Sequence, residues 1–292
     1  MRVAIIGPLC KDEVILKGRK HSQLGGAVYY IGQALSLLGV QVTAFASFGR
    51  EPKKWLAGFR TDELIRIPTE GTMKFVNEYP DSEKPDYRTQ RAEILKNEIR
   101  FEDIKDHDLS QYDDIVLAPL FHNNLSVKFF HELSNFKTKT ALSAQGMIRY
   151  LEEGKIVWRN PEQIIKVLPF INYLFLDESE LEFVTGKKIK AQGAEVLKSR
   201  GLENLVVTNG GRGSTLFLKE KSHNIKAFPP LKLMDPTGAG DSYLAGFLKA
   251  KELFKNPQQQ GEFAAMTATI SIENRGAFNK NQSYVLNRLG YH

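Results

Sequence analysis

A string near the C-terminus, Asp-Pro-Thr-Gly-Ala-Gly-Asp at 235–241, constrains this chain more than any other feature. It leads into an apolar run that places Leu244, Phe247 and Leu248 on one helical face. Glycine permits a sharp turn and leaves the backbone N–H groups uncovered, and the first N–H groups of a helix have no intrahelical partner. With the positive end of the helix dipole they form an anion site. Asp241 is placed to act on a group held there, although an Asp at this point also serves as a helix N-cap.

Length and composition narrow the class of protein. With 292 residues, of which 42% are hydrophobic and 25% charged, the chain is expected to form a single α/β domain over residues 1–292. The net charge of +6 suits a phosphate-bearing ligand, but the basic residues are scattered, so we expect no nucleic-acid partner. The single cysteine, Cys10, excludes an intramolecular disulfide. No apolar stretch is long enough for a membrane helix or a signal sequence, which predicts a cytoplasmic protein with no membrane partner.

Apolar runs that alternate with helical patterns predict the core of the fold. Strands are expected at 3–6, 41–46, 115–118, 140–144, 173–176, 205–208 and 214–218. Because helical patterns separate most of these runs, we expect an α/β fold with a three-layer, doubly wound, mostly parallel sheet.

Two polar-faced hairpins interrupt this pattern. The first is predicted by the alternation at 73–79 and 87–95, and the second by the turn within 149–158. We expect an insertion over about 72–95, with part of 12–24, to form a small β lid. An exposed hairpin without function is the alternative.

The string at 235–241 resembles the C-terminal signature of the ribokinase-like (PfkB) carbohydrate kinases. The similarity covers nearly the whole chain, from an Asp near the first strand through an early Gly-Gly pair to this signature. It implies a ribokinase-like fold and the transfer of a phosphoryl group from ATP, with Mg²⁺, to an alcohol group. By the same resemblance Asp241 is the catalytic base, and the amides of Gly238, Ala239 and Gly240 form the anion hole. Because the helix dipole favours the ionised carboxylate, we expect Asp241 to be a weak base.

Donor-side residues follow from the same resemblance. The nucleotide-binding positions are expected to be Thr208, Gly210, Gly213, Thr237, Ala265 and Ala268. The family's Asn-x-x-Glu motif, which holds the magnesium and phosphate network, corresponds to Asp177 and Glu180, with Asp in place of Asn. A solvated acidic first turn of a helix is the alternative for this pair. The resemblance leaves open a requirement for a monovalent cation.

The acceptor side departs from the family pattern. Asp12, Gly25 and Gly26 match positions that contact substrate hydroxyls, but Tyr30 stands where an Asn is usual. No pair of Arg or Lys residues is evident near Asp12 or Gly26, so we expect an unphosphorylated sugar, polyol or cyclitol as acceptor. The alternatives are a nucleoside kinase, in which Tyr29 and Tyr30 stack on the base, and a non-catalytic ligand-binding member of the family. A homodimer formed through the lid is also left open.

Overall fold

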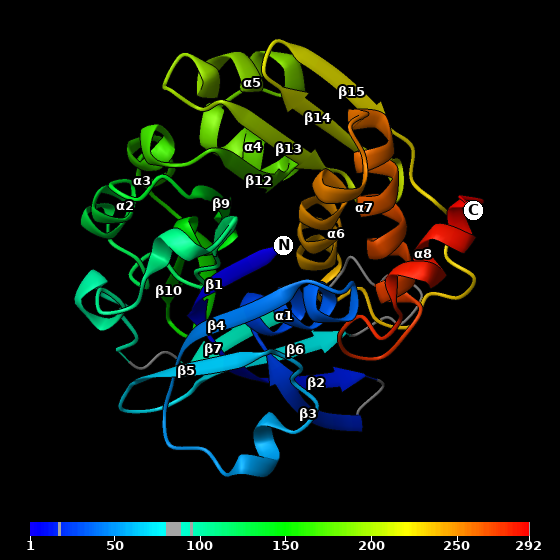
Figure 1. Cartoon of the computed structure of the whole chain (residues 1–292). Helices are drawn as coiled ribbons and strands as arrows, with labels where there is room; N and C mark the ends of the chain where they lie inside the picture. The colour runs from blue at the N-terminus through cyan, green and yellow to red at the C-terminus, as the bar shows by residue number, and fades with distance from the viewer. Residues whose placement is uncertain (17–18, 80–88, 94–95, 292) are drawn as a thin grey trace.

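The structure is a computed structural model that describes residues 1–16, 19–79, 89–93 and 96–291 (Figure 1). Parts of the expected lid insertion, at 80–88 and 94–95, lie outside these residues. Within the described residues the strands form two sheets, one of nine strands and one of six.

The nine-stranded sheet is the middle layer of the fold. Its order is β15 (Lys221–Ile225), β14 (Ser214–Leu218), β13 (Asn204–Thr208), β12 (Tyr173–Asp177), β9 (Lys139–Ser143), β8 (Asp114–Leu117), β1 (Arg2–Pro8), β4 (Gln41–Phe48) and β5 (Glu63–Pro68). Neighbours from β13 to β5 are parallel, whereas β13, β14 and β15 pair antiparallel. The strands predicted from the apolar runs, and the mostly parallel sheet, are confirmed.

Helices cover both faces of this sheet (Figure 1). Because successive residues of a strand point to opposite faces, Val3 and Ile5 enter one apolar core and Ala4 and Ile6 the other. The first core is closed by α1 (Ala27–Leu37), α6 (Ala239–Leu253), α7 (Pro257–Ile272) and α8 (Gln282–Leu289). The second core is closed by α2 (Val127–Leu133), α3 (Glu162–Val167), α4 (Glu178–Thr185) and α5 (Lys190–Lys198). The predicted three-layer arrangement is therefore confirmed.

Short 3₁₀ helices lie in the connections. They are η1 (Lys53–Leu56), η2 (Phe101–Asp103), η3 (Leu109–Gln111), η4 (Ala144–Ile148), η5 (Leu168–Phe170) and η6 (Gly210–Arg212). No helix in the described part of the chain combines the length and the apolar character that crossing a bilayer requires.

The second sheet contains both predicted hairpins. Its order is β10 (Arg149–Glu152), β11 (Lys155–Trp158), β7 (Thr89–Glu93), β6 (Met73–Tyr79), β2 (Cys10–Leu16) and β3 (Arg19–Gly25). Strands β6 and β7 pair antiparallel, as do β10 and β11, and Lys155 pairs with Arg91 to join the two hairpins. The chain passes from β1 into β2 across Leu9, and from β9 through η4 into β10. The two sheets therefore meet beside these two crossings.

Helices α6 and α7 pack closely within the first core. Gly246 of α6 permits this approach, because a Cβ atom at that position would lie 2.8 Å from the Cβ of Thr267 and 2.9 Å from the Cα of Ala264. The position of α6 therefore depends on a residue without a side chain.

We predict that Gly246→Val lowers the free energy of unfolding by about 1–3 kcal/mol, the usual range for overpacking a dense core. Urea unfolding followed by circular dichroism measures this change. Gly211→Val is the matched control, because a Cβ atom at Gly211 meets nothing within 4 Å. Equal losses in the two variants would contradict the close packing of α6 on α7.

Candidate active site

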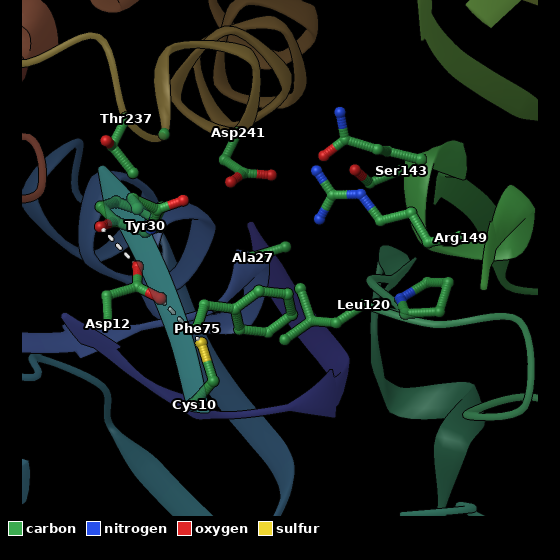
Figure 2. Close-up of a pocket in the computed structure, with 15 residues that line it drawn as sticks. Cys10, Asp12, Ala27, Tyr30, Phe75, Leu120, Ser143, Arg149, Thr237 and Asp241 are labelled. Atoms are coloured by element: carbon green, nitrogen blue, oxygen red, sulfur yellow. Dashed lines mark hydrogen bonds between the residues drawn. The ribbon is translucent and has the colours of Figure 1, made fainter. Parts of the chain in front are cut away.

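Two adjoining cavities lie at the carboxyl ends of the parallel strands, which is where open α/β sheets bind ligands. The smaller cavity, of about 100 Å³, lies among β2, β6, α1 and the start of α6 (Figure 2). The larger cavity, of about 300 Å³, lies among the ends of β12 and β13 and the start of α6. The residues that line both are Ser143, Gln145, Thr237, Gly238 and Asp241.

The N-terminus of α6 forms the boundary between the cavities. Gly238, Ala239 and Gly240 all line the larger cavity, and the amide of Ala239 also donates to the carbonyl of Pro236 at 3.3 Å. Gly238 is the N-cap and has a left-handed φ of 76°. A Cβ atom there would lie 2.4 Å from Cδ1 of Tyr30, so any side chain would displace that ring. Both the conformation and the space at this point therefore require glycine.

Asp235 holds the loop that precedes this helix. Its Oδ1 accepts a hydrogen bond from the amide of Thr237 at 2.9 Å, and its Oδ2 accepts one from the amide of Gly276 at 3.4 Å. The sequence analysis gave Asp235 no separate role. In the structure it ties the loop to the segment that follows α7.

Asp241 lies at the junction of the two cavities. Burial raises the pKa of its carboxyl group to about 7, the guanidinium of Arg149 opposes this rise, and the charge of Asp12 adds to it. The expectation that the helix dipole would make Asp241 a weak base is therefore wrong, because desolvation outweighs the dipole. A carboxyl group with this pKa is partly ionised at neutral pH and binds a proton far more readily than an exposed Asp.

Asp12 on β2 and Tyr30 on α1 are joined across the smaller cavity (Figure 2). The hydroxyl of Tyr30 donates to Oδ2 of Asp12 at 3.4 Å, and the thiol of Cys10 donates to Oδ1 at 3.3 Å. Gln23 of β3 donates to the Tyr30 hydroxyl at 3.3 Å. Tyr30 therefore positions the Asp12 carboxylate while its ring packs against Gly238.

The paired glycines contribute at different points. Gly26, the N-cap of α1 with φ 99°, lines the smaller cavity. Gly25 lines neither cavity among the described residues, but a Cβ atom there would lie 2.2 Å from the carboxyl carbon of Asp12. Gly25 therefore makes room for Asp12 and is not placed to contact an acceptor.

Asp177 and Glu180 form a capping box at the start of α4. The Asp177 carboxylate accepts from the Glu180 amide at 2.8 Å, and Oε2 of Glu180 accepts from the Asp177 amide at 2.9 Å. Both residues line the larger cavity. Glu180 is only 3% exposed, so the alternative of a solvated acidic turn does not describe it.

The second carboxylate oxygen of Glu180 points to a ligand. Oε1 is buried and has no hydrogen-bond partner among the described residues. Burial, and then the neighbouring Asp177, raise the pKa of Glu180 to about 7, and burial raises the pKa of Asp177. A buried carboxylate oxygen without a partner is unfavourable unless a cation or its bound water satisfies it. The pair therefore fits a metal network.

Half of the expected nucleotide-binding positions lie at the larger cavity, namely Thr208, Gly210 and Thr237. Gly213 instead forms the turn between β13 and β14, where a Cβ atom would lie 2.1 Å from the carbonyl oxygen of Ile225. Ala265 is 6% exposed and packs in the first core, and Ala268 packs partly buried against that core. Of the described residues, Gly213, Ala265 and Ala268 thus line neither cavity.

Several cavity residues come from segments that the sequence analysis did not connect with the site. Phe75 and Asn77 lie on β6, Gln145 lies in η4, and Arg149 begins β10. Arg149 is 7% exposed, and its guanidinium points towards Asp241 (Figure 2). The sequence analysis found no basic pair on the acceptor side, and the structure places one Arg there. Its only sequence signal is a charge that directly follows an apolar pair.

Comparisons with known proteins bear on this fold. Residues 7–283 match the pfkB family carbohydrate kinases. A nucleoside kinase from Methanocaldococcus jannaschii is 31% identical over 143 residues, which cover 48% of this chain and 46% of the relative. A ribokinase from Haemophilus influenzae is 31% identical over 124 residues, 40% of either chain. The matches thus span less than half the length of these curated relatives.

Solved structures show the same fold. A pyrophosphate-dependent kinase of the ribokinase family, complexed with a pyrophosphate analog and myo-inositol, has a TM-score of 0.84 at 21% identity and covers 98% of this chain and 99% of its own. Arabidopsis thaliana ribokinase, complexed with ribose and ATP, has a TM-score of 0.77 at 18% identity, with 99% of each chain covered. The match over residues 7–283 establishes that this chain belongs to the pfkB family of carbohydrate kinases.

Proposed function

We propose that the protein transfers the terminal phosphoryl group of ATP to an alcohol group of a small sugar, polyol or cyclitol. The observation that carries the proposal is the meeting of the two cavities at the start of α6, where Asp241 and the first amides of the helix lie together. The larger cavity takes the donor phosphates and the smaller cavity takes the acceptor. In-line transfer needs both groups at one point, and this arrangement supports it.

The start of α6 supplies the main chemistry. Phosphoryl transfer depends on positioning and on neutralising charge more than on covalent help. The amides of Gly238, Ala239 and Gly240 donate to the moving phosphoryl group without reorganising. Asp241 accepts the proton of the acceptor hydroxyl, and its pKa of about 7 suits that task at neutral pH.

Glu180 and Asp177 are the residues that fit a magnesium ion. This ion is usually held by one or two carboxylates together with nucleotide phosphates and water, and when bound it neutralises charge on those phosphates. Glu180 holds the ion or its water through Oε1, while Oε2 stays on the amide of Asp177.

Exposed apolar side chains beside α7 support a nucleotide as donor. Leu231 and Leu233, in the loop before the string at 235–241, are 77% and 45% exposed. The amide of Leu231 donates to Glu273 at 2.8 Å, and the amide of Met234 donates to the carbonyl of Ile272 at 2.8 Å, so the loop follows the end of α7. A nucleobase stacked there would cover apolar surface. A pyrophosphate donor is the alternative outcome of the experiment below.

Size and lining favour an acceptor with a single ring. The volume of the smaller cavity, about 100 Å³, is well below the roughly 300–1,000 Å³ of sites for drug-sized ligands. Asp12 and Asn77 offer groups that bind hydroxyls, and Phe75 and Leu120 form an apolar wall suited to the C–H face of a ring. A base joined to a ribose needs more space than this.

Charge disfavours an acceptor that already carries a phosphate. Asp12 and Asp241 bring two carboxyl groups to the smaller cavity, against one guanidinium from Arg149. A sugar phosphate would add about two more negative charges. The structure therefore adds a reason, independent of the missing basic pair, for an unphosphorylated acceptor.

The tyrosine pair does not support a nucleoside acceptor. The ring of Tyr29 lies 5.1 Å from that of Tyr30 and meets Phe59 edge-on at 5.6 Å. The ring of Tyr30 is pressed against Gly238. Neither ring therefore presents a free face for stacking on a base, and the expectation that they would do so is wrong.

Steady-state rates with magnesium and ATP or pyrophosphate test the proposal. The acceptors are myo-inositol, ribose, fructose, a hexose phosphate, cytidine and adenosine, and Asp241→Asn measures the background. We expect kcat/KM to be at least tenfold higher for one unphosphorylated ring polyol or sugar than for the nucleosides and the phosphate, about 1.4 kcal/mol. Preference for a nucleoside or a sugar phosphate would overturn the acceptor assignment. Transfer to none of them from either donor would overturn the kinase function.

Asp241→Asn is expected to lower kcat by about 10²–10⁴-fold, the usual contribution of a general base, with little change in ATP affinity. Its effect on stability has a definite sign. Because folding raises the pKa of Asp241 from 3.8 to about 7, the ionised carboxylate destabilises the fold progressively as pH rises through this range. The Tm of Asp241→Asn should therefore exceed that of the wild type at pH 8 and approach it near pH 4. A pH-independent difference in Tm would show that the carboxyl group is not buried.

Glu180→Gln is expected to raise the magnesium concentration for half-maximal rate by about 10-fold or more, because one buried carboxylate of the metal network is lost. Glu182→Gln on the same helix is the matched control, since Glu182 is exposed. Magnesium titrations of the two variants decide the point. An unchanged requirement in Glu180→Gln would remove Glu180 from the metal network.

A further inference from the structure

Arg149 brings a positive charge to the acceptor side of the site. Among the described residues that line the smaller cavity it is the only cationic one, and it is 7% exposed. A guanidinium withdrawn from water is unfavourable unless charged or polar partners face it. Its side chain points towards Asp241, where the two cavities meet (Figure 2).

The backbone of Arg149 is held from two directions. Its carbonyl oxygen accepts from the amide of His122 at 3.2 Å and lies 3.0 Å from Nδ1 of the same residue. The His122 ring stacks on Tyr150, with centroids 3.6 Å apart. Across the hairpin, Arg149 pairs with Trp158. The side chain therefore extends from an anchored position, as a preorganised charge requires.

The charge of Arg149 reaches groups of both cavities. Burial raises the pKa of Asp241, Glu180 and Asp177, and the guanidinium opposes the rise in each. These carboxyl groups and the donor phosphates concentrate negative charge around the point of transfer. The amides at the start of α6 face that charge from the donor side, and Arg149 faces it from the acceptor side.

We propose that Arg149 is a catalytic residue whose guanidinium contacts a non-bridging oxygen of the phosphoryl group as that group passes to the acceptor. In this step the bond between the terminal phosphorus and the bridging oxygen of the donor breaks. The acceptor oxygen bonds to phosphorus, and its proton passes to Asp241. Arg149 stays protonated and donates hydrogen bonds that strengthen as the group moves towards the acceptor. The inference rests on the proposed function and deepens it.

Arg149→Met and Arg149→Lys test the proposal, with Arg159→Met as the matched control. Arg159 lies beside the same hairpin, but its side chain is 60% exposed and pairs with Glu152. We expect Arg149→Met to lower kcat by about 10³-fold or more, as loss of a catalytic arginine does in other phosphoryl-transfer enzymes, with both KM values within about threefold. Arg149→Lys restores only part of the rate, because an ammonium lacks the planar fork. Arg159→Met keeps the wild-type kcat.

A binding measurement gives a readout that does not depend on turnover. Calorimetry compares the affinity for MgADP with fluoroaluminate, which mimics the phosphoryl group in transfer, with the affinity for a non-hydrolysable ATP analogue. Arg149→Met should lose about 100-fold in affinity for the mimic and little for the analogue, since an oxyanion contact made only in transfer is worth about that much. Thermal unfolding checks that the variant is folded. If it is not, Arg149→Lys carries the same comparison.

Several outcomes would overturn the proposal. Unchanged kcat and mimic affinity in the Arg149 variants would do so, as would equal losses for mimic and analogue, which indicate a structural role. A rise in acceptor KM alone would make Arg149 a binding residue. A wild-type protein that transfers phosphate to no acceptor would overturn the proposed function itself. An active wild type with unaffected Arg149 variants would overturn only the role of Arg149.

Discussion

The contact between the ring of Tyr30 and the backbone of Gly238 fixes the relation between the two sides of the site. Gly238 sets the start of α6 in a left-handed conformation, and the Tyr30 ring fills the space where a side chain would project. The hydroxyl of the same ring reaches Asp12 at 3.4 Å. One side chain thus determines how far the carboxylate on β2 lies from the amides of the helix. The volume of the smaller cavity follows from that separation.

The donor side could be predicted from the sequence because its geometry is local. The string at 235–241 and the capping box from Asp177 to Glu180 are contiguous, and glycine and cap chemistry determine their backbone. The acceptor side could not be predicted in the same way. Arg149 and Asn77 meet because β10–β11 joins the sheet of β6 through Lys155 and Arg91, a pairing that no local pattern encodes. The strands themselves were predictable from alternation, but their partners were not.

Expectations failed where burial overrode a local rule. The dipole of α6 acts on Asp241 as the sequence indicates, but desolvation in the folded chain has the larger effect on its pKa. Ala265 has the small side chain expected beside a ligand, yet it packs in the first core. Tyr29 offers an aromatic ring, but Phe59 already contacts it. In each case the residue type was informative, and the surroundings that decided its use came from distant segments.

The two cavities draw their walls from different parts of the chain. The larger one is built from connections of the nine-stranded sheet, whereas the smaller one adds side chains from β2 and β6 of the second sheet. Selection acting on the second sheet can therefore alter which molecule is recognised while the apparatus of transfer is inherited unchanged. Duplicated genes with this architecture can diverge in diet without reinventing their chemistry. Such a division explains how one scaffold serves relatives named for ribose and for nucleosides.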